Sequence, residues 1–217
     1  MHGTSYRYIT QHMKEILNNP NPNLIICHIG NGASMCCVKD GKSFDTTMGF
    51  TPLEGLVMGT RCGNADPSIG LFLIRQGWSA DQVDNMFNKQ SGLKGFTNKN
   101  DFRDVETMAK EGNADAKLVL EMFENRIANY IAQYANELEN KIDAIVFTAG
   151  IGENGTDCVK RTVNKVKVLN LKIDENACAT KYGDYRLITT PESQVKVYQV
   201  RTDEELMIEQ DVKKLTK

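Results

Sequence analysis

The sequence predicts a layered α/β domain. Short apolar runs typical of strands alternate with amphipathic runs typical of helices along the whole chain. No internal repeat, low-complexity segment or linker interrupts this alternation. With 217 residues, 41% of them hydrophobic, the chain can form a sizeable core in one large domain or two small ones.

The first part of the chain predicts a helix followed by an antiparallel meander. Apolar residues at helical spacing predict a helix over 5–17, with a Ser or Thr of HGTS as its cap and the NPNPN run as its end. Strands are expected at 23–27, 33–38 and 43–47. The GNG and DGK turns separate them, and the second turn is a strong hairpin signal.

Helices dominate the middle of the chain. They are expected at 67–76, at 79–88 with a Ser79/Gln82 capping box, at 100–110 and at 115–138. The longest carries a stripe at helical spacing that is interpreted as facing the core. Its members are Leu118, Val119, Met122, Phe123, Ile127, Tyr130, Ile131 and Tyr134.

The last part predicts three strands and a terminal helix. A buried strand at 143–148 runs into GIGENG, where glycines end the strand and a new helix starts. Strands at 186–189 and 195–199 precede a helix at 203–215, which Thr202 caps with Glu205 completing the box.

Composition excludes several classes of function. The net charge of -2 offers no broad footprint for nucleic acid or an anionic membrane. The longest apolar runs fall far short of the roughly 20 residues that span a bilayer, and the N-terminus lacks the apolar core of a secretory signal. The six cysteines contain no CxxC pair, so we expect buried reduced thiols and a cytoplasmic location.

Two glycine-rich turns are candidate phosphate sites. In HIGNGAS (28–34), Gly30 and Gly32 let backbone N–H groups approach a phosphate, although a turn joining two hairpin strands needs no ligand. In TAGIGEN (148–154), the glycines precede a helix N-terminus. This second turn matches neither GxGxxG nor GxxxxGK[ST], so it lacks a Rossmann or Walker fingerprint.

Charged residues give four further candidates, each with an ordinary structural explanation. Arg61 in MGTRCGNADP can present a planar fork to phosphate oxygens or simply bond loop carbonyls. His2 in HGTS lies next to the N-terminus, where a histidine is usually solvated. DFR (101–103) reads as the capped acidic first turn of a helix, and Glu204 in TDEE serves either the helix dipole or Mg²⁺ through water.

Taken together, the motifs resemble the acetate kinase family, which includes propionate and butyrate kinases. They follow in the family's order: HGTS, HIGNGAS, DGKSFDTTMGFTPLEGLVMGTR, DFR, FTAGIGEN and TDEELMI. The stretch at 41–61 is especially specific, since no rule of capping or turns requires it. The resemblance spans residues 2 to about 212.

The resemblance implies a fold and a set of site residues. It implies an actin-like, ribonuclease H-like ATPase domain of the acetate and sugar kinase superfamily, with a mixed sheet flanked by helices. It makes His2 and Arg61 transition-state stabilisers and puts Glu204 near Mg²⁺. The residues expected around ATP or ADP are His28, Ile29, Gly30, Asn31, Gly32, Asp101, Phe102, Arg103, Gly150, Ile151, Gly152, Glu153 and Asn154.

The resemblance also implies that the chain is the C-terminal, nucleotide-binding half of such an enzyme. Residues 1–202 would form this domain, and the helix at 203–217 would pack on an N-terminal domain that supplies the substrate-binding arginine and the catalytic aspartate. We expect ATP plus acetate to give acetyl phosphate plus ADP only with that domain present, in an enzyme that is a homodimer. Without it, the apolar face of the last helix would be mobile, pack elsewhere or mediate association.

Three questions stay open at this point. The acid can be propionate or butyrate instead of acetate, and the chain can be an inert nucleotide-binding or interaction module. The orientation of Arg61 is the third open question. The family usually has serine, glycine and an acidic residue after this arginine, whereas this chain has Cys62, Gly63 and Asn64 and so lacks a carboxylate near Arg61.

Overall fold

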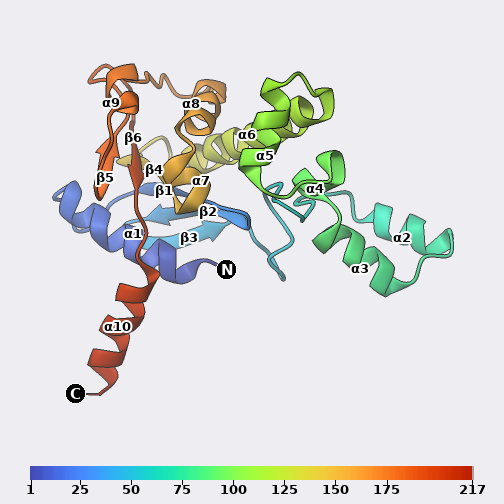
Figure 1. The fold of residues 1–217 in the computed structure, drawn as a ribbon. Helices are drawn as coiled ribbons and strands as arrows, with labels where there is room; N and C mark the ends of the chain where they lie inside the picture. The colour runs from blue at the N-terminus through green and yellow to red at the C-terminus, as the bar shows by residue number, and fades with distance from the viewer. Residues whose placement is uncertain (217) are drawn as a thin grey trace.

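A six-stranded mixed sheet forms the centre of the computed structural model, which describes residues 1–216 (Figure 1). The strands are β1 (Leu24–Ile29), β2 (Ala33–Lys39), β3 (Lys42–Thr46), β4 (Ala144–Thr148), β5 (Tyr185–Leu187) and β6 (Lys196–Val200), in the order β3-β2-β1-β4-β6-β5. Neighbours β1, β4 and β6 run parallel, whereas β2, β3 and β5 pair antiparallel. The predicted meander and mixed sheet are confirmed.

The described residues also form ten helices. They are α1 (Gly3–Ile16), α2 (Ser68–Arg75), α3 (Ala80–Lys89), α4 (Gly92–Thr97), α5 (Phe102–Lys110), α6 (Ala114–Glu137), α7 (Ala149–Asn154), α8 (Thr156–Lys165), α9 (Glu175–Ala179) and α10 (Glu204–Leu215). The sequence prediction missed α4 and α9, because five or six residues are too few to show a helical period. Among residues 1–216, no helix is both long and apolar enough to cross a membrane.

Both faces of the central strands are covered, which explains their continuous apolar sequence. Leu24 and Ile26 of β1 face α1, whereas Ile25 and Cys27 pack into the larger core under α6 and α8. The stripe predicted on α6 is partly wrong, since Leu118 and Met122 are exposed. They form an i, i+4 row beside the buried row of Val119, Phe123, Ile127, Ile131 and Tyr134, so only one side of α6 meets the core.

The Ser79/Gln82 capping box is present, but two other predicted caps are wrong. Asp203 rather than Thr202 caps α10, accepting a hydrogen bond from Leu206 N at 2.8 Å. His2 occupies the N-cap position of α1 without a side-chain cap bond, while Ser5 is buried inside the first turn. The two predicted cap residues contact each other instead, since Ser5 Oγ lies 3.0 Å from Thr202 Oγ1. This tertiary contact competes with the capping hydrogen bond that each hydroxyl could make to its own helix.

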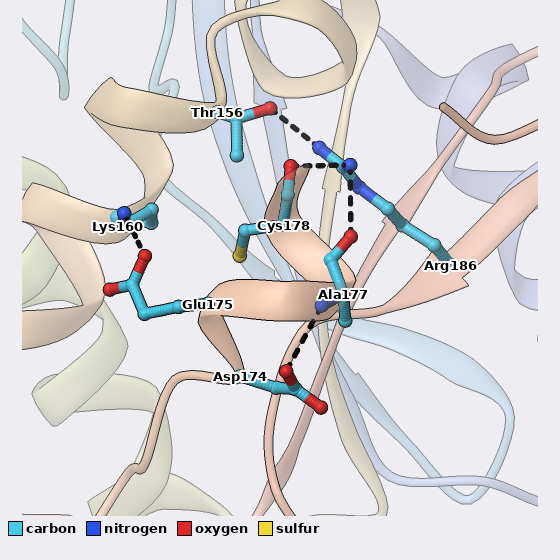
Figure 2. Close-up of polar contacts among 7 residues, drawn as sticks. All are labelled: Thr156, Lys160, Asp174, Glu175, Ala177, Cys178 and Arg186. Atoms are coloured by element: carbon cyan, nitrogen blue, oxygen red, sulfur yellow. Dashed lines mark hydrogen bonds and ion pairs between the residues drawn. The ribbon is translucent and has the colours of Figure 1, made fainter. Parts of the chain in front are cut away.

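Arg186 on β5 connects the edge of the sheet to α8 and α9 through hydrogen bonds. Its guanidinium donates to the carbonyl of Cys178 at 2.9 Å, to the carbonyl of Ala177 and to the hydroxyl of Thr156, where α8 begins (Figure 2). A Lys160–Glu175 ion pair also joins α8 to α9.

The six cysteine thiols within residues 1–216 are free and four are buried, which confirms the expectation of mostly buried reduced thiols.

Helix α10 extends away from the sheet and contacts α1 (Figure 1). Met207 is buried there, and Asp211 pairs with Arg7. Leu206, Val212 and Leu215 stay exposed. Within residues 1–216, Met207 is therefore the buried member of the predicted apolar face, and the other three members are exposed.

Candidate nucleotide site

Three segments that are far apart in the sequence meet around one cavity of about 650 Å³. They are the β1–β2 turn, the start of α5 and helix α7. The residues that line the cavity are Gly30, Asn31, Gly59, Leu93, Asn100, Asp101, Phe102, Arg103, Glu106, Gly150, Ile151, Asn154 and Gly155. Its volume is within the range of about 300–1,000 Å³ that is usual for small-molecule sites.

The parallel pairing of β1 and β4 brings two of these segments together. Their registered ends place the turn after Ile29 beside the start of α7, and a Cβ on Gly30 would lie 3.9 Å from that of Ala149. Ala149 has φ 64°, a left-handed conformation that turns the chain sharply from β4 into α7. Ligand sites at the carboxyl ends of parallel strands are typical of α/β sheets.

Gly59 lies between the β1–β2 turn and the segment that leads into α5. A Cβ on Gly59 would lie 1.8 Å from Asn31 Oδ1 and 3.0 Å from the carbonyl oxygen of Asn100. The backbone N–H of Gly59 also donates to the carbonyl of Asn31 at 3.0 Å. The MGTR segment therefore needs glycine here, because only glycine lets Asn31 and Asn100 approach each other at the cavity wall.

The DFR segment begins α5 at the rim of the cavity. Asp101 caps the helix by accepting from Arg103 N at 2.9 Å, and it also pairs with the Arg103 guanidinium through bonds of 3.0 and 2.6 Å. These hydrogen bonds lower the pKa of Asp101 to about 2 and raise the pKa of Arg103. The pair has no net charge, and it fixes the direction of the Arg103 guanidinium at an exposed rim.

Two histidine rings stack next to the β1–β2 turn. The ring centroids of His2 and His28 are 3.9 Å apart with an interplanar angle of 17°. His2 Nδ1 lies 2.7 Å from Ser34 Oγ, and His28 Nδ1 lies 2.9 Å from Ser5 Oγ. Burial, the N-terminal ammonium and Arg61 lower the pKa of His2 to about 4, while burial and His2 lower that of His28 to about 3. Both rings are therefore neutral hydrogen-bonding groups at pH 7.

Arg61 lies against the same turn. A Cβ on Gly32 would be 3.8 Å from one guanidinium nitrogen of Arg61, and that nitrogen donates to the carbonyl of Pro52 at 3.2 Å. Asn64 bonds the backbone N–H of Gly55 and the hydroxyl of Tyr130 rather than Arg61. The loop carbonyl of Pro52, not the side chain at position 64, thus orients the guanidinium.

The structure brings eight of the thirteen predicted nucleotide residues to the cavity. These are Gly30, Asn31, Asp101, Phe102, Arg103, Gly150, Ile151 and Asn154. The five that do not line it are His28, Ile29, Gly32, Gly152 and Glu153. Sequence reasoning missed Gly59, Leu93, Asn100, Glu106 and Gly155, although Asn100 borders DFR and Glu106 lies one helical turn after Arg103.

The predicted metal residue, Glu204, lies in the first turn of α10. No group of three or more His, Cys, Asp or Glu side chains within residues 1–216 is arranged to hold a metal ion. Mg²⁺ in phosphate-transfer sites keeps several waters and uses one or two carboxylates together with substrate phosphates. Glu204 does not line the cavity, and a lone carboxylate can hold such an ion only together with waters and substrate phosphates, not as an all-protein cage.

Comparison with known proteins identifies the family. The model of the acetokinase family matches residues 1–210. The acetate kinase of Mycoplasma pneumoniae is 51% identical over 99% of this chain and 54% of that protein, and the acetate kinase of Mycoplasmoides gallisepticum is 48% identical over 100% and 55%. The chain spans about half the length of the curated relatives it matches.

Solved structures agree with the sequence matches. The acetate kinase of Porphyromonas gingivalis superposes on 100% of this chain and 55% of its own, with a TM-score of 0.93 and 37% identity. A propionate kinase from Francisella tularensis covers 95% of this chain and 53% of its own, with a TM-score of 0.90 and 43% identity. The expected fold is therefore confirmed, and the chain belongs to the acetokinase family.

Proposed function

We propose that this chain supplies the ATP side of an acetate kinase, which transfers phosphate between ATP and acetate. The observation that carries this proposal is the cavity where the HIGNG, DFR and GIGEN segments meet. Glycines on two of its walls allow a phosphate to approach the backbone, and Asn31 and Arg103 add polar donors. ATP supplies the phosphoryl group, and Glu204 would hold Mg²⁺ through water, where the ion would neutralise part of the phosphate charge.

We assign His2 and Arg61 to stabilising charge on the migrating phosphoryl group. Phosphoryl transfer is catalysed by positioning and electrostatics, so fixed donors matter more than a protein nucleophile. Arg61 is held by the Pro52 carbonyl next to the HIGNG turn, and His2 is held by Ser34 and by its stack on His28. A neutral His2 donates a hydrogen bond to an oxyanion without adding a charge that Arg61 would repel.

We place the acid-binding arginine and the catalytic aspartate in the half of the enzyme that this chain does not match. Leu206, Val212 and Leu215 of α10 are then candidates to pack on that half. Helix α2 has no buried residue and exposes Ile69, Leu71, Phe72 and Ile74, which supports a homodimer built through this helix. Free thiols in all six cysteines support a cytoplasmic enzyme.

A hydroxamate assay tests the proposal. The chain is mixed with ATP, Mg²⁺, acetate and hydroxylamine, alone and with the N-terminal half of the Mycoplasma pneumoniae acetate kinase. We expect ATP binding by the chain alone but acetyl hydroxamate only when both halves are present. Arg61→Ala should then lower turnover by about 10³-fold while ATP still binds. Turnover by the chain alone contradicts the requirement for the other half, and tight binding without turnover in the mixture indicates an inert module.

The preferred acid is a second question, because a propionate kinase is among the similar structures. Comparing kcat/KM for acetate, propionate and butyrate in the mixture answers it. We expect acetate to be preferred, and a higher value for either longer acid contradicts that assignment.

A further inference from the structure

Glu153 does not line the cavity, although Gly150, Ile151 and Asn154 of α7 do. Glu153 Oε1 accepts hydrogen bonds from the backbone N–H of Ala149 at 2.9 Å and of Thr202 at 3.0 Å. The hydroxyl of Thr148 donates to the same oxygen at 3.4 Å. One oxygen atom therefore joins the β4–α7 turn to the segment between β6 and α10.

The backbone around Glu153 is also held by hydrogen bonds. The carbonyl of Glu153 accepts from Tyr182 Oη at 2.7 Å, and Gln199 Nε2 donates to the carbonyl of Gly152 at 2.7 Å. Gln199 is completely buried, and its own oxygen accepts from the guanidinium of Arg186, the residue that anchors α9 in Figure 2. Helix α7 is thus held at its carbonyl end by neutral donors and at its start by the Glu153 side chain.

The two backbone N–H groups that donate to Glu153 belong to two different parts of the proposed site. Ala149 starts α7, a wall of the cavity, in a left-handed conformation that is unfavourable for a non-glycine residue unless neighbouring contacts hold it. Thr202 precedes the turn of α10 that carries Glu204.

A chain of polar contacts continues from Thr202 towards the histidine pair. The hydroxyl of Thr202 lies 3.0 Å from that of Ser5, which in turn lies 2.9 Å from His28 Nδ1, and His28 stacks on His2. A continuous series of contacts therefore joins Glu153 to the cavity wall, to the segment that precedes Glu204 and to the His2–His28 pair.

We propose that Glu153 is a positioning residue, which locks α7 to the start of α10 as a hydrogen-bond acceptor and does not itself bind nucleotide or metal. This inference rests on the proposed nucleotide site, because the consequence we measure is nucleotide affinity. Its physical basis is that two backbone donors need an oxygen at the right distance and do not need a charge. Length and acceptor geometry should therefore matter, and ionisation should not.

Three substitutions separate these properties in the 217-residue chain. Glu153→Gln keeps the length and the acceptor but removes the charge, Glu153→Asp keeps the charge but shortens the reach, and Glu153→Ala removes both. We expect Gln to bind Mg²⁺–ADP within about twofold of the unsubstituted chain, and Asp and Ala to bind about tenfold more weakly, as for a lost buried hydrogen bond. Glu111→Ala, at an exposed carboxylate after α5, is the control and should change nothing.

Amide hydrogen exchange at Ala149 and Thr202 gives a second readout that needs no nucleotide. Both amides should stay protected in Glu153→Gln and exchange at least about tenfold faster in the Asp variant and, where it folds, the Ala variant. If Asp retains affinity and Gln loses it, the charge acts directly on metal or phosphate and the proposal is overturned. Unchanged exchange in all variants also overturns it. If the unsubstituted chain does not bind Mg²⁺–ADP, the nucleotide site fails as proposed, and the exchange pattern alone decides the role of Glu153.

Discussion

Replacing Arg161 with methionine tests the energetic cost of leaving the buried Glu124 carboxylate without its charged partner. Arg161 on α8 donates to Glu124 on α6 at 2.6 Å and to Glu106 on α5 at 2.7 Å. The Glu124 side chain is only 4% exposed, whereas that of Arg161 is 40% exposed. Burial raises the pKa of Glu124, and the hydrogen bond and charge of Arg161 oppose that rise.

The expected magnitude follows from this asymmetry. Removing one partner of a fully enclosed ion pair costs about 3–5 kcal/mol, because it leaves an uncompensated charge. Water reaches the exposed Arg161 position and can solvate part of Glu124 in the variant, so we expect a loss of about 2–3 kcal/mol at pH 7.5. Methionine retains most of the apolar stem of arginine, which keeps the packing contribution small.

The sign of the pH dependence distinguishes this cause from lost packing. In the variant, the folded-state pKa of Glu124 lies further above its ordinary value of 4.5. A carboxyl group with a raised folded-state pKa binds its proton more tightly when folded, so its protonation restores stability as the pH falls towards 4.5. The penalty should therefore be largest at pH 7.5 and smaller at pH 5.0.

Urea unfolding at the two pH values measures both effects. The double variant Glu124→Gln, Arg161→Met should recover much of the stability at pH 7.5, because it removes the most deeply buried carboxylate and leaves only Glu106, with a side chain 19% exposed, without its partner. An equal loss at pH 7.5 and pH 5.0, or no recovery in the double variant, refutes the electrostatic explanation.

Three further outcomes follow from the structure. Gly59→Ala should weaken Mg²⁺–ADP binding about tenfold in calorimetry, because its Cβ would displace Asn31 from the cavity wall, and unchanged affinity contradicts this placement. Ser79→Ala should lower the free energy of unfolding by about 1 kcal/mol through loss of the α3 capping box, and a loss below the error of urea unfolding counts against it. Burial lowers the pKa of His28 to about 3 in the folded protein. Its contribution to the free energy of unfolding is therefore complete above pH 6.5 and is lost as the pH falls, by roughly 1.4 kcal/mol per pH unit. His28→Gln should therefore reduce the slope of stability against pH between pH 6.5 and 5, where His2 still contributes, and an unaltered slope contradicts the assignment.

The sequence by itself determined the elements whose causes are local. Continuous apolar runs such as LIIC and AIVF predicted the buried strands β1 and β4, and the DGK turn predicted the β2–β3 hairpin. The capping box of α3 was predictable because its two side chains bond the backbone within three residues. The motif order also predicted the family, and the resemblance to that family implied the three segments that meet at the cavity.

Tertiary structure alone decided the residues whose partners lie far along the chain. Thr202 reads as a cap in the sequence, yet its N–H bonds Glu153, 49 residues away. Ser5 likewise bonds His28 and Thr202 instead of capping α1, and Leu118 and Met122 share the period of the core stripe but lie beside it. Local spacing sets which groups need a partner, whereas the pairing of β1, β4 and β6 sets which distant group is near enough to be that partner.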